Sequence, residues 1–228
     1  MKSTLKYFIY VLLLIGTLIS CKKPNNYKEI DKGYSYFGME QGRFVEYHVR
    51  YMNHDSLLNQ HDTLEFYYKT VIGDEYIDNE GRKGYEFLRY KKDSLNGNYT
   101  FLSKWAIFLE DNKAQLVEEN QRKVKLVFPV QKNQLWDANM YNSLGQQETH
   151  YETIHAPLSY SNLQFDSTTT VEYKRLKTLI DDQLDQEIYA KGVGMIYKVS
   201  RELQFQFGFS TPYKGTEWYY TVVNFGVE

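Results

Sequence analysis

The chain has 228 residues and a single cysteine, Cys21. Without a second thiol no internal disulfide can form, so the fold of an exported form must rest on a packed core. The formal net charge is −2, and charges of both signs are mixed along the chain without a basic stripe, which excludes nucleic acid as a partner. The apolar run from Tyr7 to Ile19 is shorter than the roughly 20 residues that cross a bilayer, which argues against a permanent span.

The position of Cys21 predicts where the protein resides. Lys2 and Lys6 precede the apolar run, and Leu18-Ile19-Ser20 connects that run to the cysteine, which is the order of a secretory leader. A cysteine here is typical of bacterial lipoproteins, in which the thiol receives a diacylglyceryl group, cleavage occurs before the cysteine and the new amino terminus is acylated. Each buried CH₂ of such an anchor contributes about 0.8 kcal/mol. We expect residues 1–20 to be a lipoprotein signal peptide and Cys21 to be the lipidation site, so the membrane is a partner through the anchor.

The remaining chain divides into a tether and one domain. Residues 21–33 begin with the polar segment Lys22-Lys23-Pro24-Asn25-Asn26, which we interpret as a lipidated tether. Removing 20 residues from 228 leaves enough chain for one large domain. The composition is 42% hydrophobic and 17% aromatic, with 22 tyrosines, which excludes general disorder. We predict a single β domain at 34–228.

The dominant sequence period from residue 34 onward is two. Val45, Tyr47 and Val49 alternate with polar residues, which predicts a half-buried strand. The pattern recurs at 64–69, 99–109, 124–128, 193–199, 203–209 and 218–222, with turn residues at 78–81, 96–98, 110–113 and 181–182. Helical spacing is weak and confined to 134–141 and 174–180. We predict an all-β fold, an antiparallel meander that forms a curved sheet, a barrel or a sandwich with minor helix; Trp105 is expected to be buried.

The segment Tyr36-Phe37-Gly38-Met39-Glu40-Gln41-Gly42-Arg43 resembles the Y-F-P-L-x-x-G-x opening of a family of small envelope lipoproteins of Bacteroidota. Further matches are Leu126-Val127-Phe128-Pro129-Val130, Trp136 with Asn139, Tyr141-Asn142, and Tyr189-Ala190-Lys191-Gly192-Val193-Gly194. The chain departs from the pattern at Gly38, where the family usually has proline. The resemblance implies an envelope lipoprotein and supplies no catalytic residues. In similar lipoproteins, acidic residues close behind the cysteine direct export to the surface; here the first, Glu29, comes late, which implies an outer-membrane protein facing the periplasm.

Motifs that could carry chemistry lack their usual context. Asp181-Asp182-Gln183-Leu184-Asp185 matches the D-D-x-x-D of prenyl synthases, but no helix or second acidic motif accompanies it, so a solvated hairpin tip is expected. Gly192-Val193-Gly194 is followed by Tyr197 where a dinucleotide loop needs a third glycine, and glycines within a strand more often mark a bulge or a bend. No G-x-S-x-G motif is present.

Histidines with neighbouring carboxylates are the candidate metal ligands. His150 and Glu152 lie two apart on an expected strand and share one face, while His54-Asp55 and His61-Asp62 are expected to flank a loop. Glu148 lies beside this pair and His155 on the opposite parity. Zinc needs three or four converging ligands, and nothing else nearby in the sequence supplies them, so a polar outer face is expected there. We therefore predict no catalytic, cofactor or metal site and no enzymatic activity.

Two function classes remain. The first is a non-enzymatic scaffold or interaction module in the periplasm, whose partner is an envelope protein that meets a tyrosine-rich surface. The alternative is a carrier that holds an apolar ligand such as an acyl chain in a curved sheet, because strands such as 85–91 carry aromatic residues on both faces. A pocket of about 300 Å³ or more, lined by aromatic side chains, would favour the carrier.

Overall fold

The computed structural model describes residues 31–160 and 162–228, and it confirms the all-β prediction. The predicted signal peptide, Cys21 and most of the predicted tether lie outside these residues. The elements are the 3₁₀ turn η1 (Tyr34–Tyr36) and the strands β1 (Arg43–Asp55), β2 (Gln60–Ile77), β3 (Lys83–Lys92), β4 (Thr100–Glu110), β5 (Lys113–Glu118), β6 (Gln121–Val127), β7 (Leu135–Asp137), β8 (Glu148–Tyr160), β9 (Leu163–Lys177), β10 (Asp181–Ala190), β11 (Gly194–Phe205) and β12 (Pro212–Val227).

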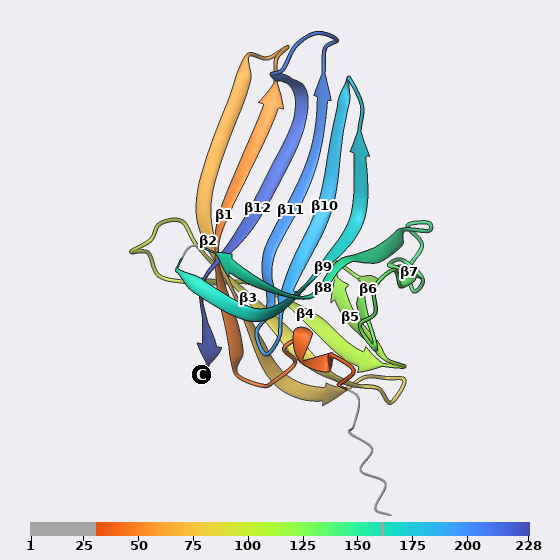
Figure 1. Cartoon of the computed structure of the whole chain (residues 1–228). Helices are drawn as coiled ribbons and strands as arrows, with labels where there is room; N and C mark the ends of the chain where they lie inside the picture. The colour runs from red at the N-terminus through yellow and green to blue at the C-terminus, as the bar shows by residue number, and fades with distance from the viewer. Residues whose placement is uncertain (1–30, 161) are drawn as a thin grey trace, which may run out of the picture. The chain divides into compact units, whose positions relative to one another are not determined.

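The strands form one antiparallel sheet in the order β6-β5-β4-β3-β2-β1-β12-β11-β10-β9-β8-β7 (Figure 1). The first and last strands pair along their length, from Arg43 opposite Val227 to Asp55 opposite Lys214. The two edge strands, β6 and β7, therefore follow each other in the chain. The sheet curves into a nearly closed barrel-like arrangement whose seam lies between β6 and the segment that contains β7 and β8.

The seam is closed by single hydrogen bonds instead of a ladder. The Val124 amide donates to the Ala138 carbonyl at 2.9 Å, and the Trp136 indole donates to the Val124 carbonyl at 3.2 Å. From β8, the Tyr151 hydroxyl donates to the Val127 carbonyl at 2.6 Å and accepts from the Val127 amide at 3.1 Å. These contacts satisfy backbone groups along β6, which blunts an edge that could otherwise pair with another chain.

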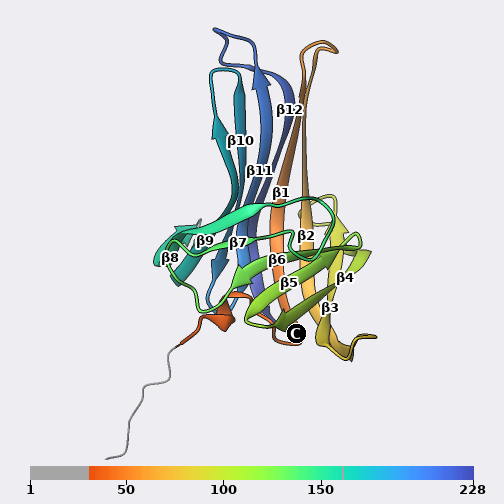
Figure 2. The ribbon, with the colours of Figure 1, turned by 90° about the vertical axis from the view of Figure 1, so that its right-hand side faces the viewer.

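Two clusters of buried side chains pack the domain. One lies at the seam and includes Tyr36, Leu126, Trp136 and Tyr151. The other includes Tyr47, Val49 and Val222, together with residues of the β8–β9 hairpin. Figure 2 shows that hairpin crossing the long strands of the sheet. The aromatic content therefore fills two cores, with a cavity lined by members of both.

β-Bulges change which side chains share a face. In the β10–β11 pair, Ile188 lies opposite Tyr197 and Tyr189 opposite Met195, so Ile196 is the extra residue. The prediction that 193–199 presents one continuous face is therefore wrong. Met195 lines the interior cavity, whereas the Tyr197 ring lies 5.4 Å from Tyr160 of β8. A bulge adds one residue to one strand, and side chains on either side of it lose their common parity.

Other local expectations are corrected as well. The residues at 174–180 form the end of β9 and a turn, and those at 134–141 contain β7 and turns, so neither segment is α-helical. Asp181 and Asp182 begin β10 instead of forming the turn. The face expected over 203–209 ends with β11 at Phe205. Cross-strand pairing dominates these segments, and the turns predicted at 78–81 and 110–113 are present.

Three long hairpins, β1–β2, β9–β10 and β11–β12, extend to the same end of the domain (Figures 1 and 2). Their tips lie side by side. The Ser56 amide donates to the Tyr213 carbonyl at 2.9 Å, and the Phe205 amide donates to the Ile180 carbonyl at 2.8 Å. The turn η1, close to the start of the domain at Lys32, lies at the opposite end.

Candidate functional site

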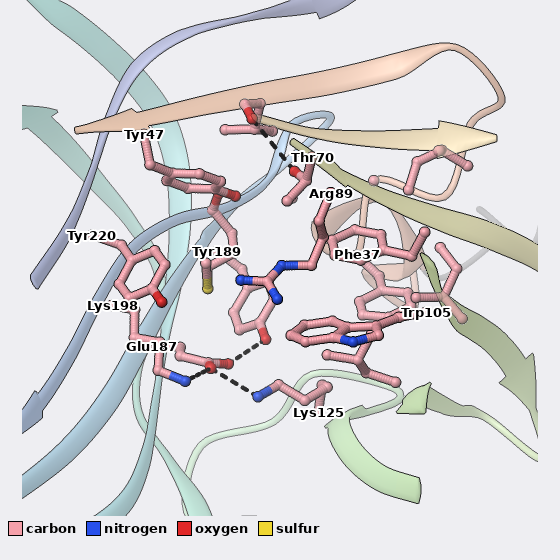
Figure 3. A pocket seen from close by; sticks show the side chains of 18 of the residues that line it. Phe37, Tyr47, Thr70, Arg89, Trp105, Lys125, Glu187, Tyr189, Lys198 and Tyr220 are labelled. Atoms are coloured by element: carbon pink, nitrogen blue, oxygen red, sulfur yellow. Dashed lines mark hydrogen bonds and ion pairs between the residues drawn. The ribbon is translucent and has the colours of Figure 1, made fainter. Parts of the chain in front are cut away.

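A cavity of about 180 Å³ lies inside the barrel-like sheet (Figure 3). Strands β1 to β6 and β10 to β12 line it, and Phe37 and Gly38 contribute from the segment after η1. The backbone at Gly38 has a φ of 63°, and a Cβ atom there would approach the Val193 carbonyl oxygen to 2.6 Å. Proline cannot adopt this φ, and the close approach leaves no room for a side chain, so this position requires glycine.

The most buried charge at the cavity is Glu187, which is 2% exposed. Its carboxylate contacts the ammonium groups of Lys125 at 2.7 Å and Lys198 at 3.4 Å. It also accepts hydrogen bonds from the hydroxyls of Tyr173 at 2.9 Å and Tyr189 at 2.5 Å. We call these five residues the Glu187 cluster. One carboxylate thus joins β6, β9, β10 and β11 across the interior.

Mutual attraction stabilises the charged forms of Glu187, Lys125 and Lys198 in the Glu187 cluster. Burial would raise the pKa of the Glu187 carboxyl, but Lys125 and Lys198 outweigh it and hold that pKa far below its usual range. Burial would lower the pKa of Lys198, but Glu187 raises it above its usual value. Burial and the Glu187 charge both raise the pKa values of Tyr173 and Tyr189, so both hydroxyls stay protonated donors.

On the other wall, Arg89 of β3 lies against aromatic rings. Its guanidinium carbon is 3.9 Å from the centre of the Trp105 ring and 4.9 Å from that of Tyr68. Phe87 stacks on Trp105 at a centroid distance of 6.4 Å. Among the described residues the guanidinium has no hydrogen-bond or ion-pair partner. Figure 3 shows it directed into the cavity beside Tyr189.

Trp105 is half-buried, not buried as its parity predicts. It borders the interior cavity and also a second, open hollow of about 470 Å³ over β2 to β5. Its indole donates to Glu119 at 3.3 Å. The second hollow has two aromatic residues, Tyr76 and Trp105, among mostly polar neighbours, so it lacks the apolar lining of a typical ligand pocket.

At His150 the structure adds a ligand that the sequence did not reveal. Ligand atoms of His150, Glu152 and Glu172 all lie within 4.8 Å of one another, and we call these three residues the His150 cluster. Glu172 comes from the neighbouring strand, directly opposite His150. Its carboxylate already accepts the Arg175 guanidinium at 2.6 and 2.7 Å. A metal ion would have to compete with that arginine for the charge of the carboxylate.

The other motifs serve local structure. His54 and His61 lie opposite each other and flank the 56–59 turn, which confirms that prediction. Asp182 accepts the Arg201 guanidinium at 3.0 Å, whereas Asp185 lies near Lys198. These carboxylates belong to a strand, so they do not align as on the helix of a diphosphate site.

The three adjacent hairpin tips expose large apolar side chains. Each tip contributes two of them: Leu57 and Leu58, Leu179 and Ile180, and Phe207 and Phe209. The most exposed residue of each tip, Leu57, Leu179 or Phe207, is about three-quarters exposed, at 76%, 77% and 76% respectively. Single exposed apolar residues are ordinary, but six on neighbouring tips form the kind of patch that marks an interaction surface.

Comparison with protein-family models, with curated proteins and with solved structures found no match for this chain. Within residues 31–160 and 162–228, no helix has the length and apolar character needed to span a bilayer.

Proposed function

We propose that the protein is a non-enzymatic interaction module, anchored to the outer membrane through lipidated Cys21 and facing the periplasm, which binds an envelope protein through its hairpin tips. The observation that carries this proposal is the set of six exposed apolar side chains on three adjacent tips. Fully burying one Leu, Ile or Phe side chain contributes about 1.5–3 kcal/mol. Covering even half of this surface would therefore offset a large part of the entropy lost on association.

Charge next to the tips favours a protein partner over a lipid surface. Asp55 precedes the first tip and caps it, accepting the amides of Leu57 and Leu58 at 3.1 and 3.2 Å. Asp181 and Asp182 follow the second tip. Carboxylates beside the apolar residues would be repelled by anionic headgroups. An apolar centre with a polar rim is typical of protein interfaces.

The shape of the domain suits an anchored module. The domain begins at Lys32, at the end opposite to the tips. A chain that is attached through residues before Lys32 therefore presents its tips at the end farthest from the attachment point. Eleven extended residues between Cys21 and Gly33 could add up to roughly 35 Å of reach.

The size and the lining of the cavity argue against an acyl-chain carrier. Its volume of about 180 Å³ is below the range of typical ligand sites, which begins near about 300 Å³. Its lining includes Lys125, Lys198 and Glu187, whose charges an alkyl chain would have to displace or leave unsolvated. An apolar cargo fits this lining poorly.

Photo-crosslinking in cells tests the proposal. A photoreactive amino acid at Phe207 should give a discrete protein adduct, whereas the same probe at Leu135 of β7, which is exposed but away from the tips, should not. Leu179→Ser should weaken the adduct without altering the fold, because that side chain is exposed. Adducts of equal yield from both positions, or with lipid alone, would contradict the proposal.

The anchor has its own test. Cys21→Ser should abolish lipidation and release the chain from the membrane fraction or leave it uncleaved. An unmodified Cys21 in the mass spectrum of the native protein would contradict the localisation.

A further inference from the structure

The charges that line the interior cavity are not balanced. The lining contains four cationic side chains, Arg43, Arg89, Lys125 and Lys198, and two carboxylates, Glu118 and Glu187. Most have partners: Arg43 with Glu40, Glu118 with Lys123, and both lysines with Glu187. Arg89 has no such partner among the described residues. Arg89 is part-buried, and a cleft whose lining carries an excess of one charge attracts a counter-ion, so an anion is expected there.

The Arg89 guanidinium is oriented to bind a planar anion. The Trp105 and Tyr68 rings occupy its faces at 3.9 and 4.9 Å. A guanidinium stacked in this way keeps its N–H edge free, and that edge matches the two oxygens of a carboxylate. A compact ammonium would not have this directional fork.

The wall across the cavity supplies a hydroxyl and an apolar surface. Tyr220 lies opposite Lys198 in the sheet, and among the described residues its hydroxyl has no hydrogen-bond partner. The Tyr220 ring lies 5.8 Å from that of Tyr68, on which Arg89 stacks, and 6.1 Å from that of Tyr47. Burial raises the pKa values of Tyr47 and Tyr220, and the nearby Arg89 charge acts against that rise in both. The Tyr47 hydroxyl is already used, donating to the Met195 carbonyl at 2.8 Å.

We propose that this cavity is a binding site for a small organic carboxylate with a flat or cyclic body, its carboxylate on the free edge of Arg89 and its body against Tyr47 and Tyr220, whose rings pack edge to face at a centroid distance of 6.1 Å. The size follows from the volume of about 180 Å³, because a cavity of about 150 Å³ accommodates benzene. The occupant therefore has on the order of six to ten non-hydrogen atoms, far fewer than an acyl chain. This site is independent of the hairpin tips.

Benzoate is the probe, and its neutral isostere benzamide is the matched control. With the full chain purified in a non-ionic detergent, titration calorimetry should give a dissociation constant on the order of 1 mM or tighter for benzoate. Benzamide should bind at least about tenfold more weakly because it lacks the negative charge, and inorganic phosphate should do so because it lacks the aromatic ring. The proposal would be overturned if benzoate did not bind at about 10 mM, or if either control bound as tightly as benzoate.

Variants and one spectrum assign the binding to Arg89. Arg89→Gln should weaken benzoate binding by about ten- to hundred-fold, and Arg89→Lys should restore part of it. Arg50→Gln, at an exposed arginine on β1, should leave binding unchanged. If Arg89→Gln does not fold, the wild-type NMR spectrum decides: benzoate should shift the Trp105 indole N–H signal and leave that of Trp136, which is bonded at the seam, in place. A shift at Trp136 without one at Trp105, or full affinity in a folded Arg89→Gln, would refute the assignment.

Discussion

Replacing Glu187 by glutamine removes one negative charge from the centre of the barrel and leaves its shape almost unchanged. In the wild-type protein this carboxylate, 2% exposed, neutralises Lys125 at 2.7 Å and Lys198 at 3.4 Å. In Glu187→Gln both ammonium groups lose their nearest carboxylate. Breaking a buried ion pair by removing one partner costs about 3–5 kcal/mol. We expect a loss of this size in the free energy of unfolding at pH 7, which is a large share of the 5–15 kcal/mol typical of a domain.

The pH dependence of this loss separates the charge from simple packing. The folded-state pKa of Glu187 lies far below its ordinary value of 4.5. The stability that its charge contributes is therefore fully present well above pH 4.5 and is lost as the pH falls, because the unfolded chain takes up the proton first. Glu187→Gln lacks this dependence. The difference between the two proteins should narrow by about 1.4 kcal/mol between pH 7 and pH 3.5.

Equilibrium unfolding in urea, followed by tryptophan fluorescence and extrapolated linearly to water, measures both quantities. Glu65→Gln is the matched control, because Glu65 is exposed and contacts His48 and Arg50 at the surface. Its free energy of unfolding should stay near that of the wild type. A Glu187→Gln protein within about 1 kcal/mol of the wild type at pH 7, or a difference that does not change with pH, would refute the electrostatic argument.

Three further predictions concern single sites. Gly38→Ala should lower the free energy of unfolding by about 2–4 kcal/mol, because it adds a backbone clash to a positive φ. Gly81→Ala, at a similar φ but with open space around it, should cost about 1 kcal/mol in the same urea assay. Equal losses in the two variants would contradict the argument from the clash. Trp105→Ala should cost about 2–3 kcal/mol, less than for a buried tryptophan, and thermal melts that match the wild type would show that its stacking is without effect. Elemental analysis of the purified wild type should find no stoichiometric zinc. Arg175→Gln should raise the zinc affinity of the His150 cluster, because it frees the Glu172 carboxylate from the guanidinium. Stoichiometric metal in the purified wild type would contradict the first expectation.

The sequence was sufficient for the fold class because the alternation of apolar and polar residues persists through most strands. Turn chemistry located the breaks at 78–81 and 110–113. The alternation failed to predict which face a side chain occupies where a bulge inserts a residue. Past Ile196 the parity shifts, and Met195 and Lys198 both line the cavity although their spacing in a regular strand would place them on opposite faces. A bulge leaves no reliable mark in a single sequence, since its residue is often as apolar as its neighbours.

The charges of the interior were not recognised, because the alternation at 124–128 assigns Lys125 to the polar face of a strand. Lys125 stands between Val124 and Leu126, and all three are buried. A lysine inside a run that is buried on both faces predicts a buried partner, because an unpaired ammonium there is too unfavourable. The identity of that partner could not be read from the sequence. Glu187 is 62 residues away, on a strand that is not a neighbour of β6 in the sheet.

Arg89 was harder to recognise. It lies in a strand with aromatic residues on both faces, where a charge is readily interpreted as the solvated side. Its place over Trp105 depends on the pairing of β3 with β4, which contains a register shift beside it. The hairpin tips were missed because alternating apolar residues at 203–209 favour a continued strand, whereas β11 ends at Phe205.

The position of the Glu187 cluster suggests what its unfavourable burial achieves. In a meander the backbone ladder normally sets the register of each strand. β6 is instead joined to the segment that contains β7 by isolated backbone hydrogen bonds, such as that from Val124 to Ala138 at 2.9 Å. Lys125 of β6 reaches across the interior to Glu187 of β10 at 2.7 Å. We infer that this ion pair positions β6 at the seam, a role in specificity that buried ion pairs can have. Amide hydrogen exchange tests it: in Glu187→Gln the Val124 amide should exchange faster relative to global unfolding, while amides of the β1–β12 ladder keep their relative protection. Uniform loss of protection across the sheet would show that the cluster contributes stability alone.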